Sequence, residues 1–231
     1  MPPTVVEPER QSLSIVILGD FNPSIFQPLW FSANGLVPEE ETKDADISII
    51  QKQIALFSMG KIQLQVDESR LGLTTIESPQ GPILRDLALG TLSILEHTPL
   101  KAIGLNLDMA FVMESEEVWH AFGDRLVPKH DWLPILEKPG MQQVVVEGKR
   151  PECAADRVHV RVQPSGLRGV LVAVNQHYQL ETKDRVDVRE RHREAIRVLR
   201  DDWVSFTAFA RDAASKLLQS NSAIEKLEGH V

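Results

Sequence analysis

Hydrophobic and polar positions in the first part of the chain predict a strand followed by a helix. Residues 13–18 form a β-branched and aliphatic run that Gly19 and Asp20 end. Asn22 and Pro23 are residue types that commonly begin helices, and spaced apolar residues follow them up to Gly35. We expect Pro28 to be tolerated near the start of this helix, where it can introduce a kink.

Between residues 46 and 77 the apolar positions recur at every second residue instead. The alternation is strict at 61–66, where Ile62, Leu64 and Val66 alternate with polar side chains. This period is typical of antiparallel hairpins with one packed face and one hydrated face. Helical spacing returns over residues 83–95, and Pro99 ends it.

The second half of the chain repeats this order of elements. Residues 101–112 predict a long strand, and Ser115 is placed to cap a helix that ends near Pro128. Three more strands and a closing helix follow. The strands are expected at 141–148, 157–163 and 169–180, and the helix has an apolar stripe with a 3.6-residue period over 188–217.

The repeated order predicts an α+β fold in which one unit occurs twice. Each unit would contain a strand, a helix, three or four strands and a second helix, and the helices would cover one face of an antiparallel sheet. This topology resembles the saddle-shaped TATA-binding-protein fold. The predicted organisation is an extended lead-in at 1–12, one domain at 13–220 with pseudo-repeats 13–99 and 100–220, and a frayed tail at 221–231.

Four segments also resemble an uncharacterised, sporadically distributed bacterial protein family. They are residues 100–108, residues 169–175, the charged stretch 181–193 and the apolar helix 199–218. The resemblance implies a cytoplasmic, non-essential accessory protein of bacteria. It provides no known active site to transfer to this chain.

The composition is that of an ordinary globular protein, with 42% hydrophobic and 25% charged residues in 231 positions. Cys153 is the only cysteine, so no disulfide can form within the chain. No apolar run is long enough to cross a membrane, and the first residues do not resemble a targeting peptide. We therefore expect a cytoplasmic protein.

The net charge of −8 is unevenly distributed along the sequence. Residues 1–100 contain 6 basic and 13 acidic side chains, whereas residues 149–200 contain 12 basic and 7 acidic ones. The basic half could attract a phosphate group or an acidic partner although the whole chain is acidic. The hypothesis that the protein binds nucleic acid starts from this uneven distribution of charge.

Motifs of the common enzyme classes are missing from the sequence. No glycine-rich phosphate-binding loop with lysine and a hydroxyl is present, and the seven histidines are scattered rather than paired. We therefore predict no cofactor, no metal and no catalytic residues. An enzyme with a composite site remains an alternative.

A row of basic residues is the main binding candidate. Arg157, His159 and Arg161 alternate with valines and are predicted to share one face of a strand, with Arg168 in the turn that follows. Such a row can bind phosphates, although it is also the ordinary pattern of a hydrated sheet face. No aromatic stacking platform accompanies the arginines.

A second candidate is a polar site made by Asp20, Asn106 and Asp108. Asp20 follows the first strand of one predicted unit, and Asp108 lies in the first strand of the other. A pseudo-twofold fold could place the two carboxylates in comparable positions, as acid–base pairs require. The alternative is that they are ordinary loop or capping acids.

The leading functional hypothesis is a non-catalytic protein that binds a partner protein, or a second copy of itself, through its sheet and loops. The alternatives are a nucleic-acid or nucleotide binder that uses the basic row at 157–168, and the composite-site enzyme.

Overall fold

The computed structural model describes residues 7–77, 80–151, 153, 155–182 and 187–228, with side chains described up to Gln219. Within this part of the chain the strands form one nine-stranded antiparallel sheet in the order β2-β3-β4-β5-β1-β6-β9-β8-β7. The strands are β1 (Arg10–Gly19), β2 (Asp46–Ile50), β3 (Ile54–Met59), β4 (Ile62–Asp67), β5 (Arg70–Thr75), β6 (Leu100–Val112), β7 (Val144–Gly148), β8 (Arg157–Pro164) and β9 (Gly169–Gln179).

Helices occupy the connections and the end of the chain, which confirms the predicted α+β class. The α-helices are α1 (Pro28–Ala33), α2 (Glu39–Lys43), α3 (Gly81–Ile94), α4 (Glu116–Leu126), α5 (Val188–Arg197) and α6 (Trp203–Glu228). Short 3-10 turns lie at Pro23–Ile25 and Lys129–Asp131, and a π-helical turn at Val198–Asp202 joins α5 to α6. The predicted tail at 221–231 overlaps the last turns of α6, and its residues 229–231 lie outside the described residues, as do residues 1–6 of the predicted lead-in.

The two halves of the chain meet at the pairing of β1 with β6. This ladder runs from Arg10 opposite Ala110 to Leu18 opposite Ala102. On one side of it the order continues as β5, β4, β3 and β2, and on the other side as β9, β8 and β7. In both halves the first strand is central and the last strand lies next to it, as the predicted duplication would require. The duplication itself and the likeness to the TATA-binding-protein fold stay predictions.

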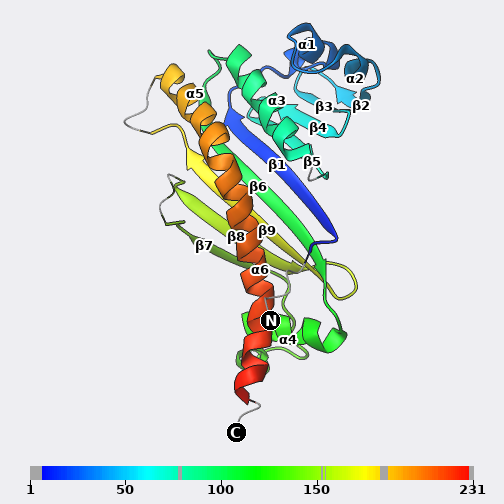
Figure 1. Cartoon of the computed structure of the whole chain (residues 1–231), viewed down its shortest axis with the longest axis vertical. Helices are drawn as coiled ribbons and strands as arrows, with labels where there is room; N and C mark the ends of the chain where they lie inside the picture. Colours follow the sequence, from blue (N-terminus) through cyan, green and yellow to red (C-terminus); the bar gives the residue numbers. More distant parts are fainter. Residues whose placement is uncertain (1–6, 78–79, 152, 154, 183–186, 229–231) are drawn as a thin grey trace.

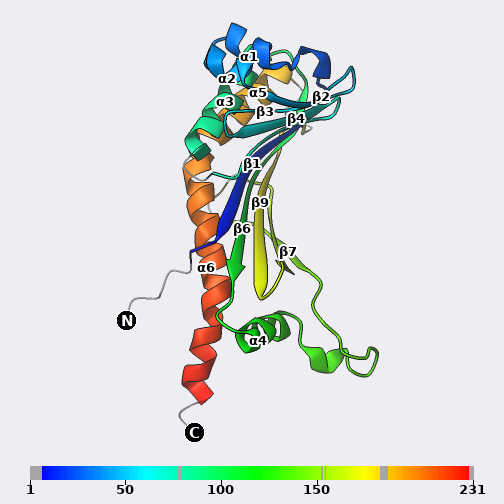
Figure 2. The same cartoon turned by 90° about the vertical axis from the view of Figure 1, so that its right-hand side faces the viewer.

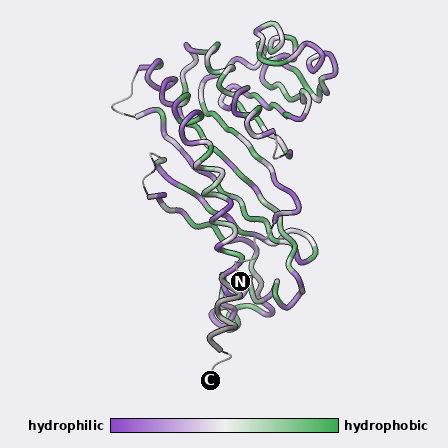
Figure 3. Tube along the Cα trace, in the orientation of Figure 1, coloured by the Kyte–Doolittle hydropathy of each residue, from purple (hydrophilic) through white to green (hydrophobic). Residues whose placement is uncertain are grey.

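The core lies on one face of the sheet because the inner strands alternate between a buried apolar side and a more polar side, whereas the edge strands β2 and β7 have no buried residue. On β1 the buried positions are Leu13, Ile15 and Ile17, and the same alternation continues on β4 and β6. Helices α3, α5 and α6 cover this face, while no described helix covers the other face of the long strands (Figures 1 and 2). Figure 3 shows the hydrophobic middle of these strands beside the largely hydrophilic α5.

Two predicted helices are interrupted in the structure. The helix expected after Asn22 is divided into a 3-10 turn and α1, because the ring of Pro28 keeps Gln27 in an extended conformation (φ −127°, ψ 150°). In the closing helix the π-helical turn separates Ala195 from Trp203. A regular α-helix would rotate these two positions roughly 80° apart, and the wider turn brings both side chains back toward the sheet.

Helix α6 is anchored by a stripe of buried residues spaced three or four positions apart, namely Trp203, Phe206, Ala210, Ala214 and Leu218. The helix contacts β6, β9 and α4, and it extends past the end of the sheet (Figure 2). It therefore connects β6 and β9 with the lower end of the molecule, where α4 lies.

We predict that Phe206→Ala lowers the free energy of unfolding by about 3–5 kcal/mol, because it leaves a cavity between α6 and the sheet. Val204→Ala on the same helix is the matched control, since Val204 is 65% exposed and its truncation should change stability by about 0.5 kcal/mol or less. Urea unfolding followed by circular dichroism measures both. Equal losses for the two variants would contradict the packing of α6 described above.

Candidate interaction surface

The open face of the sheet presents a row of polar side chains across four strands. Asn175 of β9 donates its Nδ2 hydrogen to Oδ1 of Asn106 on β6 at 2.7 Å. On the other side of Asn175 lies His159 of β8, whose Nε2 is 2.6 Å from Oε2 of Glu147 on β7. The row therefore consists of two hydrogen-bonded pairs, and the hydrogen bond to His159 lowers the pKa of the Glu147 carboxyl.

The next row holds the predicted residues Asp108 and Arg161, which face each other across Ala173 of β9. They form no ion pair within 4.0 Å, and the Nε atom of Arg161 is buried without a hydrogen-bond partner among the described residues. Burial raises the pKa of the Asp108 carboxyl, although the attraction of Arg161 opposes the shift. Two groups of opposite charge thus lie near each other without complete pairing.

The structure does not gather the four predicted basic residues into one site. Arg157 is exposed at one end of β8 and lies opposite His177, whose pKa is lowered by burial and by the charge of Arg157. Arg168 lies in the turn beyond the other end of β8, with a left-handed φ of 53°, and donates a hydrogen bond to the Glu114 carbonyl at 2.7 Å. Since His159 is paired with Glu147, little of the row is available for phosphates.

The polar residues Asp20, Asn106 and Asp108 are also separated. Asp20 forms an exposed ion pair with Lys101 at 2.5 Å, beside a cavity of about 350 Å³ that includes Phe21 and His97. Asp108 lies seven residues beyond Lys101 along β6, which corresponds to about 23 Å of extended strand. Asn106 and Asp108 therefore share the open face, and Asp20 lies at the end of the strand.

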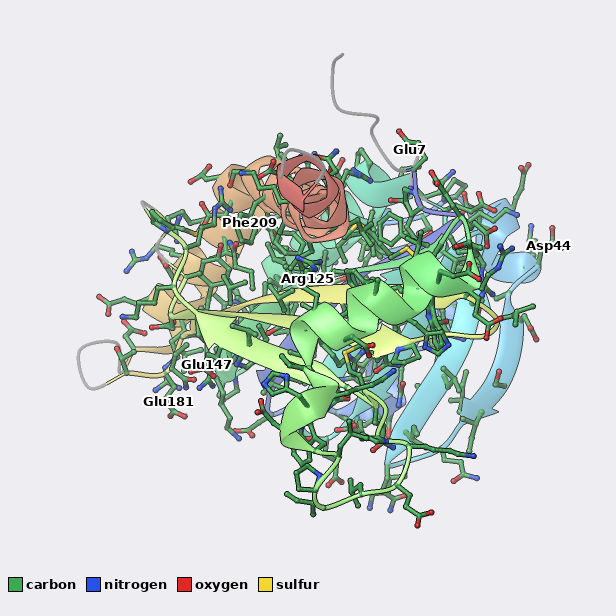
Figure 4. The ribbon with its side chains drawn as sticks, turned by 90° about the horizontal axis from the view of Figure 1, so that it is seen from below. Glu7, Asp44, Arg125, Glu147, Glu181 and Phe209 are labelled. Carbon is green, nitrogen blue, oxygen red and sulfur yellow. The ribbon has the colours of Figure 1, made fainter. Side chains whose placement is uncertain are left out.

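The two edges of the sheet differ in their chemistry. Edge strand β2 pairs with β3 through an irregular register between Ile47 and Ile49, and it follows the acidic helix α2. Edge strand β7 pairs with β8 in a regular register, and its Val145 and Val146 are 52% and 60% exposed. Bulges and charges protect sheet edges from pairing, so β7 is the less protected edge. Figure 4 shows Glu147 and Asp44 on opposite sides of the molecule, near these two edges.

An exposed apolar segment precedes β7 in the sequence. Four apolar side chains between the Lys129–Asp131 turn and β7 are exposed, namely Trp132, Leu133, Ile135 and Leu136. The exposed fraction is 44% for Trp132 and 73% for Ile135. In Figure 2 this stretch projects from the lower end of the molecule beyond α4. A group of exposed apolar residues is typical of a protein-binding surface.

A cavity of about 460 Å³ lies behind this segment. Its apolar lining includes Trp119 and Phe122 of α4, Leu133 and Met141 of the stretch before β7, and Val170 of β9. The indole of Trp119 is fixed by donating to the Gly169 carbonyl at 3.0 Å. The lining is mainly apolar, and lysines lie at its rim.

A buried polar network lies on the helix-covered face. Gln176 of β9 is fully buried, accepts a hydrogen bond from Arg150 at 3.2 Å and donates to the hydroxyl of Tyr178. Burial, together with a hydrogen bond to Asp202 of the π-helical turn, raises the pKa of Tyr178 strongly. This network joins the segment after β7 to the junction of α5 and α6. It satisfies buried polar groups and holds the junction in place.

Sequence reasoning did not single out the β7 edge, the 132–136 segment or the buried network. The available signals were the three consecutive valines at 144–146 and the aperiodic apolar stretch around Pro134. The network gave a weaker signal, because Gln176 and Tyr178 lie between the polar residues Asn175, His177 and Gln179, and no apolar–polar alternation marks the buried side there.

Other kinds of site find no support in the described part of the chain. No group of three or more histidine, cysteine or acidic side chains there is arranged to hold a metal ion. None of the helices searched in those residues has the length and apolar character needed to span a membrane. No protein-family profile matches this sequence, and neither does any curated protein.

We predict that Asp108→Asn stabilises the protein at neutral pH. The folded protein binds the Asp108 proton more tightly than the unfolded chain, because the pKa is raised from 3.8. The contribution of Asp108 to stability is therefore complete at low pH and is lost as the pH rises through the raised pKa. The difference in urea unfolding midpoint between Asp108→Asn and the wild type should become smaller as the pH is lowered.

Glu147→Gln is the control with the opposite sign. The hydrogen bond to His159 lowers the pKa of Glu147 in the folded protein from 4.5. The stabilisation that Glu147 provides is therefore present above pH 4.5 and is lost as the pH falls through the lowered pKa. If Asp108→Asn were less stable than wild type at neutral pH, the description of Asp108 as an incompletely paired carboxylate would be wrong.

Proposed function

We propose that this protein is a non-catalytic interaction protein that binds an extended segment of a partner protein along the edge of β7. The observation that carries the proposal is the regular, unprotected β7 edge with Val145 and Val146 exposed. An added strand would obtain its main-chain hydrogen bonds from β7 and apolar contacts from these two valines.

The geometry of β7 suits strand addition. The strand contains no proline and no bulge, and its β-branched valines favour extended backbone. The neighbouring strand β8 is fully paired along the length of β7, from Val144 opposite Val162 to Gly148 opposite Val158. A partner strand would therefore extend a sheet that is already rigid, which limits the conformational entropy lost on binding.

The open face supports this assignment more than it supports nucleic-acid binding. Its charges are of both signs, and Arg168 and His159 have partners within the protein. Phosphate binding depends on several cations that release counterions together. A face in which acidic Asp108 and Glu147 lie among the arginines does not provide that concentration of positive charge.

The experiment is a comparison of edge variants in a pull-down from a bacterial lysate treated with nuclease. We predict that Val145→Lys/Val146→Lys retains at least about tenfold less of the specific partner than wild type, because lysines on the edge would lose water on pairing. Ile47→Lys on edge strand β2 is the matched control, since Ile47 is 53% exposed. It should retain the partner fully.

Two outcomes would contradict the proposal. In the first, the Ile47 and β7 variants lose the same proteins, which would point to an indirect effect on folding. In the second, the retained material disappears with nuclease, which would favour the nucleic-acid alternative. Analytical ultracentrifugation of the same variants tests whether the partner is a second copy of the chain.

A further inference from the structure

The cavity behind the 132–136 segment has the size and chemistry of a small-molecule site. Its volume of about 460 Å³ lies within the range of roughly 300–1,000 Å³ found for ligand pockets. The walls come from α4, from the segment before β7 and from the ends of β8 and β9, so the cavity is built by elements far apart in the sequence.

The charged residues that line the cavity differ in whether they have an ion-pair partner. Lys129 is paired with Asp124, with 2.9 Å between Nζ and Oδ1. The ring of His120 lies 3.6 Å from Glu116. Lys138 also lines the cavity but forms no ion pair among the described residues, and its side chain is exposed to water. The rim therefore carries one positive charge without a protein counterion.

The backbone at Lys138 supports a specific role for this side chain. Its φ of 50° lies in the left-handed region, which costs energy for a residue with a Cβ. The next residues, Pro139 and Gly140, also line the cavity. Such strained conformations are found preferentially at functional sites.

We propose that this cavity binds a small amphipathic anion, with its aliphatic or aromatic part between α4 and Met141 and its carboxylate beside Lys138. The apolar walls stabilise the tail by removing it from water, and the cation selects the charge of the head group. None of the lining residues belongs to β7, although Leu133 belongs to the exposed 132–136 segment, so the two proposals are separated by variants of β7 rather than of that segment.

The first test is isothermal titration of the full chain with decanoate, octanoate and decylammonium below their micelle concentrations. We expect saturable binding of one decanoate per chain. Octanoate should bind about tenfold more weakly, because two buried methylene groups are lost. Decylammonium has the same tail and the opposite charge, so it should bind at least about fivefold more weakly than decanoate.

Variants of Gly123 test the location of the site. Gly123 lines the cavity from α4, and a Cβ built at this position has no atom within 4 Å. Gly123→Leu should therefore fill the cavity without a clash and abolish decanoate binding, while Gly123→Ala should weaken it much less. Both replacements improve helix propensity, so an unchanged or higher melting temperature would show that the fold is intact.

Lys138→Met tests the charge preference. We expect it to weaken decanoate about fivefold and to leave decylammonium unchanged or slightly tighter. Lys149→Met, an exposed lysine outside the cavity, is the matched control and should have no effect.

Three results would overturn the proposal: no decanoate binding at millimolar concentration, equal affinity for decanoate and decylammonium, or decanoate binding that survives Gly123→Leu. The Val145→Lys/Val146→Lys variant separates this inference from the proposed function. It should bind decanoate normally even though it loses the partner protein, so either proposal can fail alone.

Discussion

The pairing of β1 with β6 is the interaction on which the rest of the structure depends. It is a long antiparallel ladder, and it joins two stretches of chain that would otherwise be separate sheets. Because both strands are central, their apolar sides form a continuous surface that α3, α5 and α6 can cover. The opposite sides of the same strands become one open polar face. The position of every candidate site follows from this division.

The open face and the edges have different roles because their polar groups are satisfied to different degrees. On the face, side chains such as Asn106 and Asn175 bond to each other, and the strand backbones are paired on both sides. At the edge, the outward N–H and C=O groups of β7 have no strand partner in the described chain. Main-chain groups with unmet hydrogen-bonding capacity are the stronger basis for recognition of an extended segment.

The lower end of the molecule combines features that an isolated core would not require. Helix α6 continues beyond the sheet to contact α4, and α4 in turn forms a wall of the apolar cavity. The segment between α4 and β7 covers that cavity with one side and exposes Trp132 and Ile135 with the other. A compact core could have been closed with fewer exposed apolar residues. Their exposure is the physical reason to assign binding to this end.

The local patterns in the sequence were sufficient for most of the elements. Strict alternation at Ile62, Leu64 and Val66 fixed a strand with one packed face, and Ser115 caps α4 by accepting from the Val118 N–H at 3.3 Å as its residue type predicts. These features depend on neighbours in the chain, so the sequence alone could identify them. The break at Gln27 is also local, because the Pro28 ring acts on the residue before it, and a kink at Pro28 was expected. The π-helical turn was harder to predict, because it depends on packing against the sheet.

The sites required the tertiary structure. Whether Asp20 lies near Asp108 is decided by strand length and register, and whether Arg168 joins the row on β8 is decided by the geometry of one turn. The β7 edge is an edge only because no other described strand pairs with it, and the cavity exists only where α4 meets the ends of β8 and β9. The sequence by itself determined which segments are strands and helices and which of their faces are apolar, because these properties arise between residues a few positions apart. Only the tertiary structure decided which polar groups are paired, exposed or enclosed, because those properties arise between residues far apart in the chain.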